Sequence, residues 1–353
     1  MSWTDSKWGK WMLVAGVDLG GTAVNYTLLN DREEFLIVGM CEYPARSTEG
    51  PAICLQQIAD GLKMAVQRTG VSLADVAVVG LDTPGPASAT GVLSAKGSTN
   101  FVHSDWANYD MCANLTQVLG KPVVYLNDAN AAAVWGHFAL FGTSSGNTSI
   151  SCIVGTGLGG GIIMDGSVIK GRKGFGGELG HVLIPYQTIP GIEGLKPECN
   201  CGRTGDLESL CSLTSIRRYL LPHFLKQYPD HELGKVGDPH KAAHRVRGMA
   251  ENGDPMCRDI FRVEARALGL FFDQMINTFD PDALIVGGGV VETSAEFQRW
   301  FMEEIRIGMG VQREEQADIP IHVMPNGDTA GARGAALEAL KFAHAADLPH
   351  GSQ

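Results

Sequence analysis

Two glycine-rich stretches decide the fold of this 353-residue chain: Gly16-Val17-Asp18-Leu19-Gly20-Gly21-Thr22 and Gly155-Thr156-Gly157-Leu158-Gly159-Gly160-Gly161. Each follows a short apolar run and leads into a second apolar segment, so each predicts a β-hairpin with glycine at its turn. Glycine lets a backbone turn tightly and approach a ligand with its N–H groups uncovered, and successive N–H groups form a concavity that binds anions. The repetition predicts two similar α/β halves with a cleft between them, where a polyphosphate would be held from two sides.

Composition is that of an ordinary globular protein, with 44% apolar and 19% charged residues. The formal net charge of −11 argues against a nucleic-acid partner, because nucleic-acid binding depends on basic residues that neutralise phosphates. No segment has the length of a membrane-spanning helix and the first residues do not resemble a signal peptide, so we expect no membrane partner. The eight cysteines are mostly scattered singly, which favours reduced thiols and a cytoplasmic location.

Predicted strands and helices alternate along the chain, which indicates an α/β protein whose sheets are covered by helices. Apolar periodicity predicts strands at residues 14–18, 24–29, 76–81, 122–126 and 283–286, and helices at residues 51–69, 109–119, 131–141, 207–224, 254–279 and 332–345. The segment 171–205 is rich in glycine and contains cysteines. It is too long and irregular for a simple connection, which indicates a functional role.

A third glycine turn, Gly287-Gly288-Gly289, follows the apolar residues 283–286. A single glycine pair usually marks a plain turn, but three such turns at strand ends, two of them alike, favour a ligand site. The phosphate-loop pattern G-x-x-x-x-G-K-[ST] is absent. Residues 155–160 match G-x-G-x-x-G only formally, because a strand rather than a helix is expected to follow them.

Asp128 lies between an apolar strand and an alanine-rich helix. One interpretation is a helix N-cap. The other is a general base that accepts the proton of an attacking hydroxyl, a role typically worth ~10²–10⁴ in rate. The two roles are compatible in one residue.

Candidate metal ligands gather between residues 178 and 211. The segment Glu178-Leu179-Gly180-His181 precedes Cys199-Asn200-Cys201, and thiolate and imidazole are the ligands that zinc prefers in closed four-ligand sites. Asp206 and Cys211 are the two candidates for the fourth ligand. A zinc ion here would fix Glu178, His181 and Glu208 for contact with a polar ligand.

Together these motifs resemble the ROK family of bacterial sugar kinases and sugar-responsive repressors, within the actin-like ATPase superfamily. The resemblance covers about residues 16–336. Residues 18–22 resemble the family's first phosphate loop, residues 155–161 its second, and residues 285–289 its nucleotide-side strand end. Thr83-Pro84-Gly85-Pro86 resembles the sugar-side loop, with Asn100 in the stretch that follows. Leu126-Asn127-Asp128 resembles the segment of the catalytic aspartate, and residues 177–181 with residues 199–208 resemble the zinc and sugar signature.

The resemblance implies two actin-like, ribonuclease H-like domains with mixed sheets flanked by helices and a ligand cleft between the domains. We expect a smaller N-terminal domain at residues 1–125, with a C-terminal helix at about 332–346 packing back on it. A larger domain at residues 126–331 would carry the zinc and sugar loop at residues 171–208.

The resemblance also implies the site residues. Asp128 would be the catalytic residue, and the sugar would contact Asn100, Asn127, Asp128, Glu178, His181 and Glu208. ATP and Mg²⁺ would lie against Asp18, Gly20, Gly21, Thr22, Gly155, Thr156, Gly157, Gly287, Gly288 and Gly289. A structural Zn²⁺ would be bound by His181, Cys199, Cys201 and Asp206.

Two residues depart from the family pattern. The family usually has Cys where this chain has Asp206, although a carboxylate is also an acceptable zinc ligand. Ala23 stands where many members have Lys. This removes a positive charge near the phosphates but leaves the backbone concavity, so we expect altered nucleotide affinity rather than inactivity.

These inferences predict a cytoplasmic ATP-dependent hexokinase of the glucokinase type, which phosphorylates the 6-hydroxyl of glucose. The alternative is an N-acetylhexosamine kinase that acts on N-acetylglucosamine or N-acetylmannosamine, and polyphosphate is a less favoured donor. A sugar-responsive repressor is disfavoured because only 15 residues precede Gly16, where such members carry a helix-turn-helix domain, and because Asp128 is present. The expected partners are a small sugar and ATP, in a homodimer or homotetramer.

Overall fold

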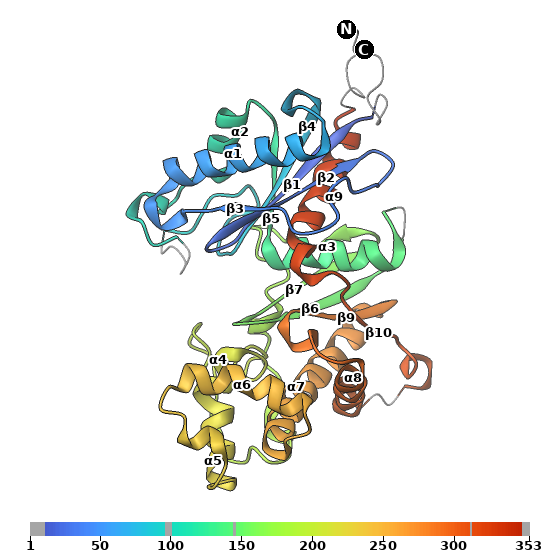
Figure 1. Cartoon of the computed structure of the whole chain (residues 1–353). Coiled ribbons are helices and arrows are strands. Elements are labelled where there is room, and N and C mark those ends of the chain that lie inside the picture. Colours follow the sequence, from blue (N-terminus) through green and yellow to red (C-terminus); the bar gives the residue numbers. More distant parts are fainter. Residues whose placement is uncertain (1–10, 96–100, 144–145, 311–312, 348–353) are drawn as a thin grey trace. The chain divides into compact units, whose positions relative to one another are not determined.

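Both glycine stretches form hairpin turns in the computed structural model, which describes residues 11–95, 101–143, 146–310 and 313–347 (Figure 1). The chain divides into two compact units. Unit 1 comprises residues 1–145, 168–177 and 325–353, and unit 2 comprises residues 146–167 and 178–324.

Unit 1 contains a mixed five-stranded sheet in the order β3-β2-β1-β4-β5. Strand β1 pairs antiparallel with β2 and parallel with β4, which in turn pairs parallel with β5. The strands are β1 (Leu13–Leu19), β2 (Ala23–Asn30), β3 (Glu42–Pro44), β4 (Val76–Thr83) and β5 (Val123–Asn127). The helices of this unit are α1 (Pro51–Thr69), α2 (Met111–Leu119), α3 (Asp128–Phe141) and α9 (Ala330–Ala345).

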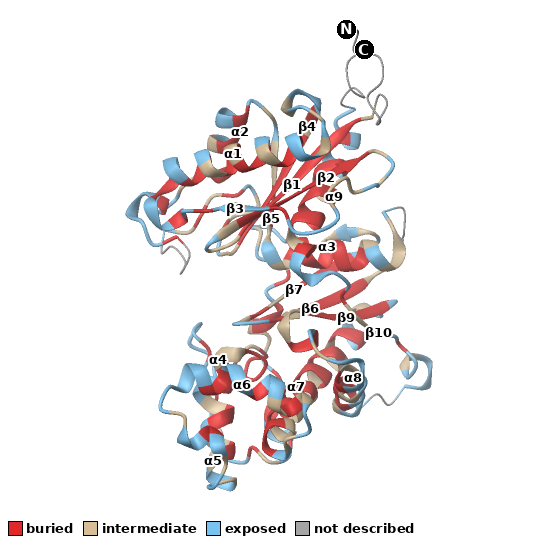
Figure 2. Ribbon diagram, in the orientation of Figure 1, coloured by how far each residue is buried: buried red, intermediate tan, exposed pale blue. Residues whose placement is uncertain are grey.

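The two faces of this sheet have different roles, because successive side chains of a strand point to opposite sides. Ala15, Val17 and Leu19 of β1 join a buried apolar cluster with residues of α1 and α2, and Figure 2 shows β1 and β4 buried along most of their length. The other face packs on α9. A Cβ atom at Gly16 would lie 1.8 Å from the Ala332 carbonyl oxygen, so only glycine lets this helix approach the sheet so closely.

Unit 2 repeats the topology of unit 1. Its sheet has the order β8-β7-β6-β9-β10, and β6 pairs antiparallel with β7 and parallel with β9, which pairs parallel with β10. The strands are β6 (Ser149–Val154), β7 (Leu158–Met164), β8 (Ser167–Val168), β9 (Ala283–Gly287) and β10 (Ile321–Val323). In each unit a central strand therefore has a hairpin partner on one side and two parallel strands on the other. The predicted duplication of an α/β half is confirmed.

Helices of unit 2 gather around its longest helix, α7. They are α4 (Leu213–Ser215), α5 (Leu221–Gln227), α6 (Pro239–Glu251), α7 (Pro255–Phe279) and α8 (Ala295–Met309). Gly269 of α7 lies so close to α8 that a Cβ atom would be 2.3 Å from the Ile305 carbonyl oxygen. Among the described residues, none of the helices has both the length and the apolar character needed to cross a membrane.

The expected helix at residues 207–224 is wrong over its first third. Residues 206–212 form turns instead, in which the Asp206 carboxylate accepts from the Ser209 N–H at 2.9 Å. The helix begins at Leu213, where the Ser212 hydroxyl caps it by accepting from the Ser215 N–H at 3.0 Å.

The first unit extends to residue 145 rather than 125. The reason is helix α3, which packs on α9: a Cβ atom at Gly334 would lie 1.7 Å from the Ala131 carbonyl oxygen. Trp135 Nε1 also donates to the Pro325 carbonyl at 2.7 Å. Residues 168–177 belong to the same unit, where the Lys170 ammonium group forms an ion pair of 2.6 Å with Glu338.

Candidate functional site

The first glycine turn, Gly20-Gly21-Thr22, joins β1 to β2 in unit 1. The Gly20 N–H closes the turn on the Ala23 carbonyl at 2.9 Å. The Gly21 carbonyl accepts from the Ser47 hydroxyl at 3.2 Å, and the Thr22 carbonyl accepts from the Ala45 N–H at 3.0 Å. The carbonyl oxygens of Gly21 and Thr22 are therefore held inside the unit, which leaves the N–H groups of these two residues for an anion.

The second turn, Gly155-Thr156-Gly157, uses the same device in unit 2. The Gly155 carbonyl accepts from the Leu213 N–H at 2.9 Å, and the Thr156 carbonyl accepts from the Thr214 hydroxyl at 2.8 Å. Thr214 also donates its N–H to Thr156 at 3.2 Å. Both hairpins thus have their carbonyl oxygens occupied by a neighbouring segment, a feature that the glycine pattern alone did not indicate.

The third glycine turn lies beside the second one within unit 2. Gly288 has a φ of +83°, and a Cβ atom there would lie 2.4 Å from the Val154 carbonyl oxygen at the end of β6. Arg247 of α6 donates to the Gly289 carbonyl and forms an ion pair of 3.5 Å with Glu292. This places a cation at the turn that the resemblance assigns to the nucleotide, and the sequence patterns did not single it out.

Asp18, which is half-buried, and Asp82 form a carboxyl pair on the α9 face of unit 1. They are register partners on β1 and β4, and Asp82 is 0% exposed. Neither oxygen of Asp82 accepts from an N–H or O–H donor of the described residues. Burial raises the pKa of Asp82 well above its ordinary value, and the charges of Asp18 and Asp128 raise it further. Burial also raises the pKa of Asp18, so the pair binds a proton more tightly than two separate carboxyl groups, and the stronger shift favours Asp82 as its site.

Asp128 is the first residue of α3, directly after β5. The N-cap is Asn127, whose side-chain oxygen accepts from the Asn130 N–H at 2.8 Å, so the interpretation of Asp128 as the N-cap is wrong. Asp128 Oδ1 accepts instead from the Ala129 N–H at 2.8 Å. The side chain is exposed at a helix N-terminus, a position where the helix dipole favours its negative charge.

The sugar residues expected in unit 2 lie on a segment that packs against the second hairpin. Glu208 Oε2 accepts from the Leu158 N–H at 3.0 Å, and the Glu208 N–H donates to the Gly180 carbonyl at 2.8 Å. Burial raises the pKa of Glu178, His181 lowers it and the Glu208 carboxylate raises it further. Glu178, His181 and Glu208 are thus brought together with the second glycine turn.

Four expected zinc ligands, His181, Cys199, Cys201 and Asp206, have ligand atoms within 4.8 Å of one another. Tetrahedral zinc with bonds of about 2.0–2.3 Å needs ligand atoms about 3.3–3.8 Å apart. Asp206 Oδ2 lies 3.3 Å from His181 Nδ1 and 3.3 Å from Cys201 Sγ, and Cys199 Sγ lies 3.6 Å from His181 Nδ1. The donor set and its spacing fit zinc.

The other candidate for the fourth ligand, Cys211, lies elsewhere. It is fully buried, and its thiol donates to the Glu264 carbonyl of α7 at 3.2 Å. Asp206 is therefore the residue that completes the cluster.

A second cluster, His231, Asp254 and Cys257, does not fit a metal. His231 Nδ1 accepts from the Leu233 N–H at 3.2 Å, so the ring proton resides on Nε2. Nε2 then donates to the Asp254 carboxylate at 3.0 Å and has no lone pair for a cation. These contacts stabilise the start of α7, whose N-cap is Asp254.

The remaining site residues divide between the units. Asp18, Gly20, Gly21, Thr22, Asn127 and Asp128 lie in unit 1, and Gly155, Thr156, Gly157, Glu178, His181, Glu208, Gly287, Gly288 and Gly289 lie in unit 2. Asn100, a predicted sugar ligand, lies outside the described residues.

Comparison with known proteins places this geometry in a family. The model of the ROK family matches residues 14–341. A glucokinase of Halalkalibacterium halodurans is 31% identical over 281 residues, which cover 78% of this chain and 79% of the relative. An N-acetylmannosamine kinase of Vibrio cholerae is 28% identical over 280 residues, which cover 79% of this chain and 84% of the relative.

A solved structure shares the fold. The ROK family glucokinase from Streptomyces griseus, in complex with glucose and AMPPNP, is 27% identical and has a TM-score of 0.69, with 93% of this chain and 99% of that chain covered. The actin-like fold expected from the sequence is confirmed, and the chain belongs to the ROK family.

Proposed function

We propose that this protein transfers the γ-phosphoryl group of ATP to the 6-hydroxyl of glucose. The chain is an ATP-dependent sugar kinase. The proposed transfer of the phosphoryl group to a hydroxyl is supported by one observation within unit 1. Strands β1, β4 and β5 are parallel, so their carboxyl ends meet at one edge of the sheet. That edge carries the first glycine turn after β1, the segment Thr83–Pro86 at the end of β4 and Asp128 after β5. A phosphate-binding turn and a proton acceptor thus share one edge.

Asp128 would act as the general base. Its exposed carboxylate would accept the proton of the sugar 6-hydroxyl as that oxygen attacks the γ-phosphorus in line with the departing ADP. The N–H of Ala129 holds one carboxylate oxygen at 2.8 Å and so fixes the orientation of the group. Most of the remaining catalysis would come from positioning and from charge stabilisation of the phosphoryl group.

The two glycine turns would bind the phosphates of ATP through their N–H groups. Mg²⁺ bound with ATP would neutralise phosphate charge, and Asp18, a half-buried carboxylate at the end of β1, would hold it through water. The turn Gly287-Gly288-Gly289 would contact the nucleoside side of ATP. Arg247, which donates to the Gly289 carbonyl and pairs with Glu292, holds this turn in place.

The sugar hydroxyls would be bound by Asn127, Glu178, His181 and Glu208. We infer that His181, Cys199, Cys201 and Asp206 hold a structural zinc ion that fixes this part of unit 2. The inference is supported by the ligand spacing and by Asp206, a fully buried carboxylate whose one ion-pair partner among the described residues is His181. All eight cysteines are free thiols, which supports a cytoplasmic enzyme.

An N-acetylhexosamine kinase is the second candidate, because the relative from Vibrio cholerae is an N-acetylmannosamine kinase at 28% identity. Glucose is favoured by the higher identity of 31% to the glucokinase of Halalkalibacterium halodurans.

A coupled assay of ADP release tests the proposal. Purified protein is incubated with ATP and Mg²⁺ against glucose, mannose, N-acetylglucosamine and N-acetylmannosamine, with polyphosphate as a second donor. We expect the highest kcat/KM with glucose and ATP. A higher kcat/KM with an N-acetylhexosamine would replace glucose by the second candidate, and turnover with polyphosphate alone would reject ATP as the donor.

A further inference from the structure

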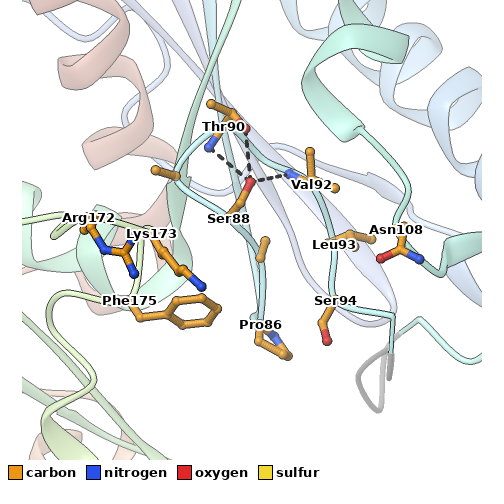
Figure 3. Close-up of a pocket in the computed structure, with 12 residues that line it drawn as sticks. Pro86, Ser88, Thr90, Val92, Leu93, Ser94, Asn108, Arg172, Lys173 and Phe175 are labelled. Atoms are coloured by element: carbon orange, nitrogen blue, oxygen red, sulfur yellow. Dashed lines mark hydrogen bonds between the residues drawn. The ribbon is translucent and has the colours of Figure 1, made fainter.

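Unit 1 contains a pocket of about 510 Å³ next to the Thr83–Pro86 segment. This volume lies within the roughly 300–1,000 Å³ that is typical of small-molecule sites. Residues 86–94 and Asn108 form one side of the pocket, and Arg172, Lys173 and Phe175 form the other (Figure 3). Pro86 ends the segment that resembles the sugar-side loop, and none of the other lining residues is among those assigned above to glucose, ATP or zinc.

The two sides of the pocket are joined by backbone contacts. The Ala89 N–H donates to the Lys173 carbonyl at 3.1 Å, and a Cβ atom at Gly174 would lie 2.2 Å from the Ala89 nitrogen. Gly174 has a φ of +90°, a conformation that favours glycine. The backbone beside the two basic residues is therefore fixed against the opposite side.

The side of the pocket at residues 86–94 is a tight turn stabilised by a serine hydroxyl. Ser88 Oγ accepts from the N–H groups of Thr90 at 3.3 Å and Val92 at 3.1 Å, as Figure 3 shows. The Ser94 N–H donates to the Pro86 carbonyl at 3.0 Å. This wall is a preformed structure rather than an extended loop.

Two basic side chains face the pocket without an anionic partner. Among the described residues, no carboxylate pairs with Arg172 or Lys173, and neither side chain forms a hydrogen bond or a ring contact. Several other arginines of the chain are paired with carboxylates, as Arg262 and Arg266 are with Glu304. In a chain with a net charge of −11, two adjacent unpaired cations on a pocket wall indicate an anionic ligand.

The chemistry of the wall selects the kind of anion. A phosphomonoester has a charge of about −1.5 to −2 at pH 7, which matches two cations. Arginine offers a planar fork of donors for two phosphate oxygens, and lysine adds a point charge. Phe175 is 47% exposed and presents an apolar surface on one side of the pocket, and the other side carries the polar side chains of Thr90 and Asn108, a combination suited to a hydroxylated ring.

We propose that this pocket binds a sugar phosphate, with the phosphate against Arg172 and Lys173 and the sugar ring between Phe175 and the Pro86–Ser94 side. The choice of a hexose rests on the proposed function, because a hexose 6-phosphate is the product that reaction releases. The binding of a phosphomonoester rests on the pocket alone. The enzyme would therefore hold its product at a site distinct from the site that binds the sugar to be phosphorylated.

Isothermal titration calorimetry tests the proposal on the full-length protein saturated with glucose and a non-hydrolysable ATP analogue. Glucose 6-phosphate is titrated into the wild type, into Arg172→Ala/Lys173→Ala, and into Arg217→Ala/Lys226→Ala. The last variant is the control. It removes the same charge from two exposed residues of unit 2 that do not line the pocket. Arg172→Lys keeps the charge without the planar fork.

We expect one site for glucose 6-phosphate in the wild type, binding at least tenfold weaker in Arg172→Ala/Lys173→Ala and within twofold of the wild type in Arg217→Ala/Lys226→Ala. Arg172→Lys should lie between them, and it keeps the test usable if the double alanine variant does not fold. Absence of binding to the saturated wild type, or equal binding by both double variants, would overturn the proposal. Equal affinity for inorganic phosphate would reject the sugar phosphate in favour of an unselective anion site.

The calorimetric readout does not depend on turnover. Failure of the kinase assay with every sugar therefore contradicts the proposed function, whereas failure of the titration contradicts the pocket assignment.

Discussion

Asp18 and Asp82 are register partners on the adjacent parallel strands β1 and β4, and both carboxyl groups lie at the first turn of α9. A Cβ atom at Gly331 would lie 2.7 Å from Asp18 Oδ2 and 3.2 Å from Asp82 Oδ2. Two carboxyl groups this close, with no lysine or arginine paired to either among the described residues, cannot both be ionised at low energetic cost. Asp82, which is completely buried and has the more strongly raised pKa, is the member of the pair that favours the protonated form, while Asp18 lies half-buried at the carboxyl end of β1.

Asp82→Asn should stabilise the protein increasingly as the pH rises. Burial raises the pKa of Asp82 in the folded state, so the native protein keeps a proton that the unfolded chain releases above about pH 4. Native stability therefore falls as the pH rises above that value, by at most about 1.4 kcal/mol per pH unit. Asparagine has no such proton and can still donate to Asp18.

Thermal unfolding of both proteins at pH 4.5, 6 and 8 measures this effect. The Tm of Asp82→Asn should exceed that of the wild type by more at pH 8 than at pH 4.5. Each kcal/mol of stability corresponds to roughly 2–4 °C in Tm. A Tm difference that stays constant across the three pH values would show that Asp82 is not protonated in the native state.

Gly331→Ala should impair catalysis more than folding. The added methyl group would displace the Asp18 carboxylate, since Asp82 behind it is fully buried and cannot move away. Displacement of a positioning group by about 1 Å can cost ~10²-fold in rate. We expect a lower kcat and a weaker dependence on Mg²⁺ concentration. Gly327→Ala is the control, because nothing lies within 4 Å of its Cβ position. Equal kcat values for the two variants would show that the position of the Asp18 carboxylate does not affect the reaction.

Metal analysis should find about one zinc per chain, lost in Cys199→Ser and retained in Cys257→Ser. The first cysteine lies in the cluster whose spacing fits zinc, and the second lies beside His231, whose Nε2 proton is donated to Asp254. Asp206→Cys should bind zinc more tightly, because thiolate is a softer ligand than carboxylate. Zinc retained by Cys199→Ser, or lost from Cys257→Ser, would place the metal elsewhere.

Glu264→Gln should also stabilise the protein at alkaline pH. Burial raises the pKa of Glu264 to about 8, and the Ser212 N–H opposes this shift. The native state therefore binds a proton more tightly than the unfolded chain between pH 4.5 and 8, and stability declines across that interval. Glutamine keeps the acceptor oxygen for Ser212 without the titrating proton. In urea unfolding at pH 5 and pH 8, the exposed control Glu296→Gln should show the wild-type pH dependence. The prediction fails if Glu264→Gln shows that same dependence.

Local patterns predicted the parts of the fold that depend on local chemistry. Helix α1 was predicted from its apolar periodicity with the observed bounds of Pro51–Thr69, and the structure shows Gly50 and Gly70 as its two caps. Helix α6 was missed because its buried face consists mainly of alanines, Ala242, Ala243 and Ala250, which follow the helical repeat but are only weakly apolar in a polar segment. Helix α8 was also missed, although Phe297, Phe301 and Ile305 follow the helical repeat.

The candidate site likewise contains residues that local sequence patterns predict and residues that they do not. The glycine turns, Asp128 and the cysteine cluster have sequence patterns of their own. Asp82 and Arg247 do not, because their roles arise from strand register and from a helix that the periodicity did not indicate. The pocket beside Arg172 and Lys173 likewise depends on a contact between residues 89 and 173, far apart in the sequence.

The role of Asp128 as the general base is tested most directly by steady-state kinetics of Asp128→Asn together with glucose binding by calorimetry. Asparagine preserves the size of the side chain and its oxygen for the Ala129 N–H, but it cannot accept the proton of the 6-hydroxyl. We expect unchanged glucose affinity and a kcat lower by ~10²–10⁴ in Asp128→Asn, while the exposed control Asp230→Asn keeps the wild-type kcat. A near-normal kcat in Asp128→Asn would contradict the assignment of Asp128 as the base.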